Sequence, residues 1–367
     1  AAASFITRHV ALASEQPVLL IGEESYLPYQ RPPLSKKYLL GQLERERLFI
    51  RPLEWYQDQN INLRLDTRVD AIDRVDRKVV TCSGESIEYS KLLLCTGSSA
   101  RNLPTANGGD LDGVFTLRSI DDIDKMSPEF QPERKLLIIG GGYIGLEAAA
   151  SARQMGLEVT LLEMTDRILQ RVAAAATSSY FRKLHIRHGV DLRESVRMTR
   201  LLGEDGSVRG VELETGEVID ADLVLVGIGS SPNTELAQAA GLDCDNGIRV
   251  SETCQSSDPN IYAAGDCTNF VRNGQHIRLE SVQNAADQGD LVARVMAGEA
   301  VTYTALPWFW SEQYDCRLQI VGLNQGHNQT VIRAGANPSI MSVWYYRDDA
   351  LLAIDAMNDP KSYAFGT

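Results

Sequence analysis

A glycine-rich segment at residues 140–145 has the residue types of a loop that binds a dinucleotide phosphate. It reads GGGYIG and fits the pattern G-x-G-x-x-G. Gly140 permits a tight turn, Gly142 lets the backbone approach a pyrophosphate, and Gly145 lets a helix pack closely on a strand. A helix that begins at such a loop presents its positive dipole end to the phosphates. The residues that we expect to contact the nucleotide here are Gly140, Gly142, Tyr143, Ile144 and Gly145.

An acidic residue follows this loop at the distance that ribose recognition requires. Glu163 lies 23 positions after Gly140, at the end of an apolar run at residues 159–162. A dinucleotide-binding unit places its ribose-binding acid about 20 positions after the loop. The carboxylate would accept hydrogen bonds from ribose hydroxyls and would repel a 2′-phosphate. The spacing therefore predicts a site that prefers NADH to NADPH.

A second acidic residue of the same kind lies near the start of the chain. Glu23 follows an apolar run at residues 18–21, and residues 1–10 have the composition of a helix body. Counting back about 20 residues from Glu23 places the matching glycine loop at or just before residue 1. We therefore expect a first dinucleotide-binding unit whose strand and glycine loop precede Ala1.

A third segment, at residues 261–267, has features of a flavin site. It reads IYAAGDC, an apolar strand that ends in Gly265 and Asp266. A carboxylate at such a strand end can bind a ribityl hydroxyl of a flavin, and the alternative is an ordinary turn aspartate. The residues ESV at 280–282 precede an expected helix that Ser281 could cap. The N-terminus of that helix would offer positive charge to the N1–C2=O edge of a flavin.

The cysteines and histidines argue against other chemistry. The six cysteines form no C-x-x-C pair and have no zinc-ligand spacing, so they are interpreted as reduced packing thiols of a cytosolic protein. This excludes reductases that need a redox-active cysteine pair. His185 and His188 lie three apart on an expected helix and could share a metal, but a solvated basic helix face is the favoured interpretation. No Ser/His/Asp arrangement is found, and no metal site is predicted.

The elements that must position these residues alternate between strands and helices. Apolar runs at 135–140 and 159–162 are typical of buried parallel strands, with a helix expected between them through Gln154. The 367 residues suggest two or three domains. They carry 36 Lys+Arg against 49 Asp+Glu, and this net charge of −13 disfavours nucleic-acid binding. No apolar run approaches the length of about 18 residues that marks a membrane-spanning helix.

Eight segments spread over nearly the whole chain carry a family resemblance. They read PYQRPPLSKKYL (28–39), LLLCTGS (92–98), LIIGGGYIGLE (137–147), VTLLE (159–163), LVGIGSSPN (225–233), SDPNIYAAGDC (257–267), RLESVQNA (278–285) and PWFWSEQY (307–314). Together they resemble the FAD-dependent, NADH-linked ferredoxin reductases of the putidaredoxin reductase-like family, which serve bacterial cytochromes P450 and ring-hydroxylating dioxygenases. PPLSK and PWFWS are more specific than any glycine motif. Compared with that family, we expect further residues before Ala1 and a C-terminal tail after Thr367.

The resemblance implies an α/β fold with two Rossmann-like dinucleotide-binding domains and an α+β C-terminal domain. A discontinuous FAD domain would comprise residues 1–104 and 232–303, and an NAD domain at 105–231 would be inserted into it. The C-terminal domain would occupy residues 304–367. Gly227, Ile228 and Gly229 would return the chain between the nucleotide domains, near the bound NADH.

The resemblance also assigns two catalytic residues. Lys36 matches the family lysine near flavin N5, and Glu147 matches the acid that can pair with it at the nicotinamide side. A buried ion pair is costly unless it is well hydrogen-bonded, so its presence would argue for a role. The alternative for Lys36 is an ordinary surface lysine beside Lys37. Related NADH oxidases and CoA-disulfide reductases carry a reactive cysteine near the position of Ser35, whereas this chain has no cysteine before Cys82.

The remaining implied contacts surround the two nucleotides. Trp310 is expected near the flavin, with a core aromatic as the alternative. Arg171 would clamp the ribose or a phosphate of NADH, with a surface arginine as the alternative. The implied FAD contacts are Ala1, Glu23, Lys36, Val69, Thr96, Gly97, Arg118, Gly265, Asp266, Glu280, Val282 and Trp310. Beyond the glycine loop, the implied NAD contacts are Glu147, Glu163, Arg171, Gly227, Ile228 and Gly229.

These parts imply a reductase. Hydride would pass from C4 of NADH to flavin N5, and the reduced flavin would give electrons singly to a [2Fe–2S] ferredoxin, with positioning supplying most of the catalysis. A rubredoxin- or nitrite-type reductase and a signalling flavoprotein resembling apoptosis-inducing factor are the alternatives. Arg51, Arg294 and Arg317 would form a basic patch for an acidic ferredoxin. We expect a cytoplasmic monomer or weak dimer that binds neither nucleic acid nor membrane and acts indirectly with a P450 or dioxygenase.

Overall fold

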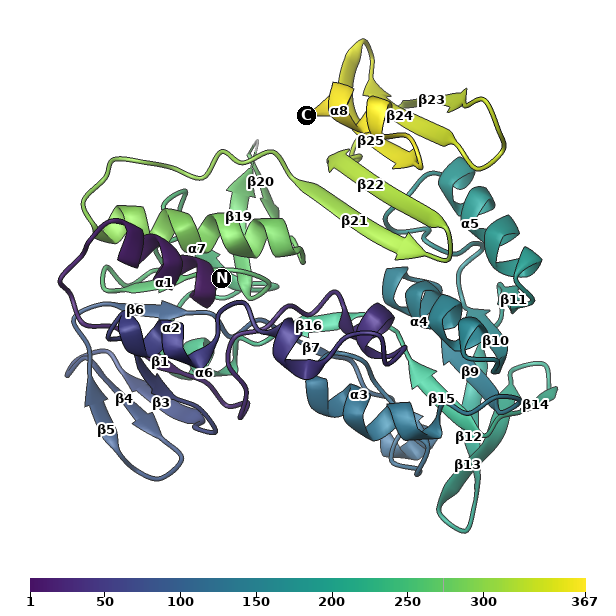
Figure 1. The fold of residues 1–367 in the computed structure, drawn as a ribbon, viewed down its shortest axis with the longest axis horizontal. Helices are drawn as coiled ribbons and strands as arrows, with labels where there is room; N and C mark the ends of the chain where they lie inside the picture. Colours follow the sequence, from purple (N-terminus) through teal and green to yellow (C-terminus); the bar gives the residue numbers. More distant parts are fainter. Residues whose placement is uncertain (273) are drawn as a thin grey trace. The chain divides into compact units, whose positions relative to one another are not determined.

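The computed structural model describes residues 1–272 and 274–367 (Figure 1). The chain forms two compact units, and each is assembled from three separate segments. Unit 1 comprises Ala1–Gln30, Arg45–Ser99 and Ser231–Ala305, and unit 2 comprises Arg31–Glu44, Ala100–Ser230 and Leu306–Thr367. Within the described residues, no helix is both long and apolar enough to cross a membrane. The three-domain division given above stays a prediction.

Unit 1 contains the first expected dinucleotide-binding unit. Helix α1 (Ala2–Ala11) precedes strand β1 (Leu19–Ile21), which pairs in parallel with β2 (Asn62–Arg64). Helix α1 packs against α7 (Val282–Met296), where Gly289 is required because an added Cβ would lie 2.3 Å from the Ala1 carbonyl oxygen. Arg8 and Asp290 join the two helices by an ion pair of 2.5 Å. The helix and strand expected at residues 1–10 and 18–21 are confirmed within one residue.

Short strands and helices complete unit 1. Strand β18 (Ile261–Ala263) pairs in parallel with β6 (Leu92–Leu94), and the apolar side chains of both contribute to the buried core. An antiparallel sheet contains β3 (Val69–Asp73), β4 (Lys78–Thr81) and β5 (Ser86–Glu88), and a third sheet contains β17 (Ile248–Val250), β19 (Thr268–Arg272) and β20 (Gln275–Ile277). The remaining helical elements are η2 (Arg45–Leu48), α2 (Leu53–Asp58) and α6 (Glu235–Ala239).

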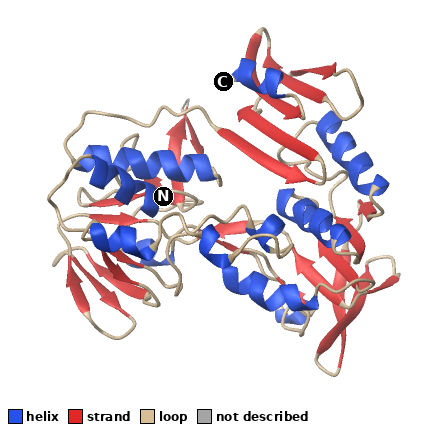
Figure 2. Cartoon of the chain, in the orientation of Figure 1, coloured by secondary structure: helices blue, strands red, loops and turns tan. Residues whose placement is uncertain are grey.

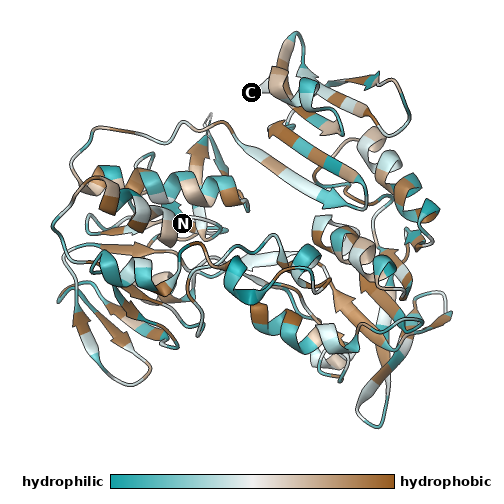
Figure 3. Cartoon of the chain, viewed as in Figure 1, coloured by the Kyte–Doolittle hydropathy of each residue, from teal (hydrophilic) through white to brown (hydrophobic). Residues whose placement is uncertain are grey.

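Unit 2 is built on a five-stranded parallel sheet. Its order is β11 (Asp191–Glu194), β10 (Glu158–Glu163), β9 (Lys135–Ile139), β15 (Leu223–Val226) and β8 (Val114–Phe115). The inner strands β9 and β15 are nearly continuous apolar runs (Figure 3), as expected of strands covered on both faces. Helix α4 (Tyr143–Gln154) connects β9 to β10, and α5 (Ala175–Arg187) connects β10 to β11. The predicted α/β fold class is confirmed.

Two further sheets belong to unit 2. Strands β12 (Met198–Glu204), β13 (Ser207–Leu213) and β14 (Val218–Asp220) form an antiparallel sheet. The C-terminal segment forms an antiparallel sheet in the order β21 (Trp308–Gln313), β22 (Cys316–Gly322), β25 (Ala350–Met357), β24 (Met341–Arg347) and β23 (Gln329–Ala334), followed by α8 (Pro360–Gly366) (Figure 2). Short elements η1 (Leu34–Tyr38), α3 (Ile120–Met126) and η4 (Ser127–Glu129) also lie in unit 2, and η3 (Thr105–Asn107) follows β7 (Ser98–Ala100).

A buried carboxyl group ties the C-terminal sheet to helix α5. Asp355 of β25 is 1% exposed, and its Oδ2 accepts hydrogen bonds from Thr177 Oγ1 at 2.7 Å and from the Tyr345 hydroxyl. The Tyr345 oxygen in turn accepts from the Ala174 backbone nitrogen at 2.9 Å. Asp355 Oδ1 has no hydrogen-bond partner among the described residues. Burial raises the pKa of Asp355 from 3.8 to about 6, because the two donors at Oδ2 only partly offset the lost solvation.

The substitution Asp355→Asn should remove a fall in folding stability that the wild type shows between about pH 4 and pH 6. The folded state binds the Asp355 proton more tightly than the unfolded state, so this group stabilises the fold fully below about pH 4. That contribution, about 3 kcal/mol for a shift of about two pKa units, is lost as the pH rises to about 6. Urea denaturation at several pH values should show this fall in the wild type and in Asp349→Asn, an exposed neighbour, but not in Asp355→Asn. A difference between wild type and Asp355→Asn that is independent of pH would contradict the assignment.

Candidate functional site

The glycine loop at the start of α4 is shaped by contacts that only glycine permits. Gly140 has a φ of +110°, and a Cβ there would lie 2.4 Å from the Gly227 carbonyl oxygen. A Cβ on Gly145 would lie 2.1 Å from the Gly140 oxygen. Gly142 is the N-cap of α4, makes no side-chain cap, and has open space where its Cβ would stand. The first N–H groups of a 12-residue helix therefore face an open position, which suits an anionic group.

Glu163 lies at the end of β10 and holds the glycine loop as well as facing it. Its Oε2 accepts from the Gly141 backbone nitrogen at 2.8 Å, and its Oε1 accepts from the nitrogen and hydroxyl of Thr165 at 2.8 and 2.6 Å. A carboxylate has about four lone-pair positions, so acceptor capacity remains for ribose hydroxyls. The sequence pattern identified Glu163 but missed its two partners, since any residue can supply a backbone N–H.

The predicted return segment lies beside the same loop. The Gly227 nitrogen donates to the Ile139 oxygen at 2.7 Å, directly where β9 enters the loop. A Cβ on Gly229 would lie 3.9 Å from the Arg171 guanidinium. The structure thus brings the glycine loop, residues 227–229 and Arg171 together in unit 2, with the Ile144 side chain 42% exposed at the first turn of α4.

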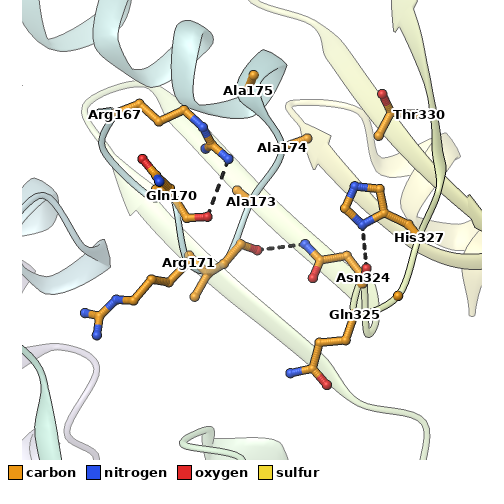
Figure 4. Close-up of a pocket in the computed structure, with 12 residues that line it drawn as sticks. Arg167, Gln170, Arg171, Ala173, Ala174, Ala175, Asn324, Gln325, His327 and Thr330 are labelled. Atoms are coloured by element: carbon orange, nitrogen blue, oxygen red, sulfur yellow. Dashed lines mark hydrogen bonds between the residues drawn. The ribbon is translucent and has the colours of Figure 1, made fainter. Parts of the chain in front are cut away.

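A pocket of about 460 Å³ lies next to Arg171 (Figure 4). It is lined by the loop between β10 and α5, by the first residue of α5, by the segment after β22, and by Thr330 of β23. Asn324 Nδ2 donates to the Val172 oxygen at 2.9 Å, which fastens one wall to the other. Arg167 is held by Ser178 Oγ at 2.5 Å. Arg171 points away from Arg167 and makes no hydrogen bond or ion pair within the described residues, so its charge is available to a ligand.

Lys36 and Glu147, the two predicted catalytic residues, form an ion pair in unit 2. Lys36 Nζ lies 2.6 Å from Glu147 Oε2, and the two side chains are 15% and 6% exposed. The same oxygen accepts from Ser35 Oγ at 2.6 Å, and Oε1 accepts from Ser311 Oγ at 2.7 Å. Lys36 also donates to the Pro32 oxygen at 3.1 Å and to Ser35 Oγ at 3.4 Å. Lys36 is therefore a largely buried, paired lysine, while its catalytic role stays a prediction.

Ser35 and Ser311 are site residues that the sequence reasoning did not assign. They lie within PPLSK and PWFWS, the segments with the most specific resemblance, and are direct neighbours of Lys36 and Trp310. Ser35 is a hydrogen-bond donor to Glu147. Both serines are buried, with exposures of 3% and 0%. The sequence signal that could have identified them is their position inside the two most specific family segments, where neither serine is expected to act as a nucleophile.

Several predicted flavin contacts lie together in unit 1. Ser98 Oγ donates to Asp266 Oδ2 at 3.2 Å, next to Thr96 and Gly97. A Cβ on Gly265, whose φ is +90°, would lie 3.4 Å from the Ala1 side chain. Thr96 Oγ1 donates to the Asn233 oxygen at 2.7 Å, and the Asn233 amide donates back to the Thr96 oxygen at 2.8 Å. Thr96, Gly97, Asp266, Gly265 and Ala1 therefore belong to one neighbourhood.

The N-terminus of α7 has the cap expected from the sequence. Ser281 is the N-cap and accepts from the Asn284 nitrogen at 3.1 Å, so the cap prediction is confirmed. Val282 follows at 47% exposure, and Glu280 pairs with Arg278. An orphaned polar atom lies further along the helix: Gln288 Nε2 is buried without a partner among the described residues, while its Oε1 accepts from the Gly265 nitrogen at 2.8 Å.

The other predicted flavin contacts are not shown to join that neighbourhood. Glu23 is exposed after β1, and Val69 begins β3, both in unit 1. Arg118 and Trp310 belong to unit 2 together with Lys36. Trp310 is half-buried on β21, with its ring centroid 5.5 Å from that of Trp308. Their roles toward a flavin stay predictions.

The interpretation of His185 as part of a solvated basic helix face is wrong. His185 of α5 is 0% exposed, because this face of the helix packs on β21. Its Nε2 lies 2.8 Å from Gln313 Oε1, and burial lowers the pKa of His185 to about 4, so the ring is neutral. His188 instead stacks on Tyr314 with ring centroids 3.7 Å apart.

The described cysteines are all free thiols. Cys254, Cys267 and Cys316 are buried, and burial raises the pKa of Cys254 to about 12 and of Cys316 to about 11. A thiol held protonated is a poor nucleophile and a poor metal ligand. Among the residues that the structure describes, no group of three or more His, Cys, Asp or Glu side chains could hold a metal ion.

Most of the chain matches two known protein families. Residues 1–289 match the sequence profile described as pyridine nucleotide-disulphide oxidoreductase, and residues 308–367 match the one described as reductase C-terminal. The chain is 44% identical over 353 residues to a ferredoxin–NAD(P)⁺ reductase of Sphingomonas sp., covering 95% of this chain and 85% of that relative.

Two solved structures are similar over nearly the whole chain. One is the covalent putidaredoxin reductase–putidaredoxin complex, with a TM-score of 0.96 and 37% identity, covering 99% of this chain and 88% of the matched chain. The other is the ferredoxin reductase for the CYP199A2 system from Rhodopseudomonas palustris, with a TM-score of 0.94 and 41% identity, covering 99% and 91% of the two chains.

The variants Glu163→Ala and Glu163→Gln should reduce the preference for NADH over NADPH. Alanine removes the ribose acceptor, the repulsion of a 2′-phosphate and the anchor of Gly141, so affinity for NADH should fall about tenfold or more. Glutamine keeps one acceptor oxygen for the loop and removes only the charge, so it should narrow the preference with a smaller loss for NADH. Binding titrations with both nucleotides measure this, with Glu158→Ala, exposed at the other end of β10, as the control. An unchanged NADH/NADPH ratio in both variants would remove Glu163 from the ribose site.

Proposed function

The chain belongs to the pyridine nucleotide-disulphide oxidoreductase family, among its ferredoxin reductases, and we propose that it passes electrons from NADH through FAD to a [2Fe–2S] ferredoxin. One geometric observation carries this proposal. Helix α4 begins at the glycine loop and bears Glu147 one turn later, paired with Lys36. At 1.5 Å per residue, the acid lies only about 6 Å along the helix from Tyr143. Phosphate binding and a buried ion pair therefore share one rigid element.

The residues of both units fit their nucleotides. In unit 2, the open position at Gly142, the free Arg171 charge and Glu163 would hold NADH by its pyrophosphate and ribose. In unit 1, the Asp266 carboxylate, the N-terminus of α7 and the orphaned Gln288 amide offer polar groups suited to FAD. When bound, FAD supplies the hydride-accepting and one-electron-donating chemistry that protein side chains lack.

The Lys36–Glu147 pair would hold the Lys36 ammonium in one position at the reaction site. The Glu147 carboxylate holds the ammonium at 2.6 Å, and the Pro32 oxygen orients it from a second side at 3.1 Å. The third donor reaches Ser35 Oγ at 3.4 Å, the longest of the three, and this donor is the one that a nucleotide acceptor would take over. Low exposure strengthens each of these interactions, because water does not compete for the same groups.

The electron acceptor is a ferredoxin, and we propose that the ferredoxin in turn passes its electrons to an oxygenase. A cytochrome P450 or a ring-hydroxylating dioxygenase would take the electrons next, since one similar structure is a reductase of the CYP199A2 system. The rubredoxin- and nitrite-type reductases and the signalling flavoprotein are not favoured by the relatives found. The six free thiols support a reducing compartment such as the cytoplasm, and we propose a monomer or weak dimer.

The predicted basic patch for the ferredoxin is weakened by local pairing. Arg294 pairs with Glu299 at 2.8 Å, and Arg317 lies 4.0 Å from Glu312. The Arg51 guanidinium lies over the Trp55 ring, 5.2 Å from its centroid. Each arginine therefore already interacts with a side chain of this protein, whose net charge is −13, and this reduces the positive charge that the patch would present to a ferredoxin. Docking through these three residues stays a prediction.

Reduction of a panel of electron carriers tests the proposed function. With FAD-loaded protein and NADH, [2Fe–2S] ferredoxins should be reduced rapidly, and rubredoxins more slowly, as followed by bleaching of the carrier's visible absorbance. NADPH should replace NADH poorly because Glu163 repels the 2′-phosphate. Flavin that is reduced by NADH but transfers no electrons to any ferredoxin would reject the reductase and favour the signalling flavoprotein.

A further inference from the structure

A buried row of hydrogen-bonded polar side chains extends from Glu147 Oε1, the carboxylate oxygen that Lys36 does not contact. Ser311 and Gln313 lie on β21 and His185 lies on α5, with exposures of 0%, 1% and 0%. Glu147 Oε1 is 2.7 Å from Ser311 Oγ, Ser311 Oγ is 3.1 Å from Gln313 Nε2, and Gln313 Oε1 is 2.8 Å from His185 Nε2. All these residues belong to unit 2.

The hydrogen bonds between these side chains can run in only one donor-to-acceptor direction. An ionised carboxylate only accepts, so Ser311 must give its one proton to Glu147. The Ser311 oxygen then accepts from the Gln313 amide nitrogen, which turns the amide oxygen toward His185. His185 is neutral, with its pKa lowered to about 4 by burial, and must carry its proton on Nε2. Each donor thus points toward the carboxylate, and aligned hydrogen bonds strengthen one another.

The two oxygens of Glu147 are supported from different sides. Oε2 accepts from Lys36 and Ser35, whereas Oε1 accepts from Ser311 alone among the described residues. The titratable groups that face Glu147 are Lys36 from η1 and Tyr143 from its own helix. Those that face His185 are His188 from α5 and Tyr314, whose hydroxyl is 3.5 Å from His185 Nδ1. Ser311 is thus the group that stops the carboxyl plane from rotating away from Lys36.

We propose that Ser311, Gln313 and His185 are positioning residues that hold Glu147 ionised and in one rotamer, and thereby fix the ammonium of Lys36. This inference rests on the proposed function only for its consequence in catalysis. It explains why a polar row runs through an interior where hydrophobic side chains would pack at lower cost.

The chemical reactivity of Lys36 tests the positioning directly. Holoenzyme is labelled with a trace of acetic anhydride, and acetylation of Lys36 is compared with that of exposed Lys37 by mass spectrometry. In Ser311→Ala, the Lys36/Lys37 ratio should rise about fivefold, as expected when one hydrogen bond of ordinary strength no longer holds the pair. Gln313→Leu leaves the Ser311 hydroxyl in place and should raise the ratio less.

The matched control is Ser342→Ala. Ser342 is also a 0% exposed serine of the C-terminal sheet, bonded to Trp344 Nε1 at 3.1 Å and to Ser362 at 3.0 Å, and it does not touch Glu147. It should lower the melting temperature as much as Ser311→Ala but leave the Lys36/Lys37 ratio unchanged. Equal ratios in the wild type, Ser311→Ala and Ser342→Ala would overturn the proposal. If Ser311→Ala does not fold, an unchanged ratio in Gln313→Leu overturns it instead.

A second measurement tests whether these positioning residues affect the reaction. The limiting rate of flavin reduction at saturating NADH, followed by stopped flow, should fall about fivefold in Ser311→Ala with the affinity for NADH unchanged, and neither should change in Ser342→Ala. A labelling change without carrier reduction would leave the positioning intact and reject the proposed function. Unchanged labelling and an unchanged limiting rate would reject the positioning even if ferredoxin is reduced.

Discussion

The buried carboxylate of Glu147 is the constraint on which unit 2 depends. A charge at 5% exposure is costly unless it is paired and hydrogen-bonded. The chain meets that requirement with Lys36 and Ser35 from residues 31–44, and with Ser311 from residues 306–367. Two segments distant in sequence must converge on helix α4 for the charge to be tolerated. This convergence accounts for the assembly of unit 2 from separate stretches of chain.

The same helix connects this constraint to nucleotide binding. A Cβ on Gly145 in its first turn would clash with the Gly140 oxygen of the loop before it, and Glu163 fastens that loop through the Gly141 nitrogen. The position of Glu147 is therefore set by the backbone geometry that forms the phosphate site. Replacing either glycine would displace both the phosphate site and the ion pair, because the helix moves as one body.

Local patterns predicted the elements, whereas tertiary contacts decided the side chains. The apolar runs at 135–140 and 159–162, the glycine spacing and the Ser281 cap were sufficient to place β9, α4, β10 and the start of α7. The burial of His185 was not predictable, because α5 offers no local signal that β21, well over a hundred residues later, covers that face. The roles of Ser35 and Ser311 were likewise invisible, since a serine that orients a carboxylate looks like any other serine in the sequence.

A double-mutant cycle on the free energy of unfolding tests the central claim most directly. Lys36→Met leaves a buried carboxylate without its cation, and Glu147→Gln leaves a buried ammonium without its anion, so each should cost about 3–5 kcal/mol. The double variant should cost less than the sum of the two by about 2 kcal/mol or more, because neither charge is then stranded. Two single effects that simply add would contradict the claim that this pair organises unit 2.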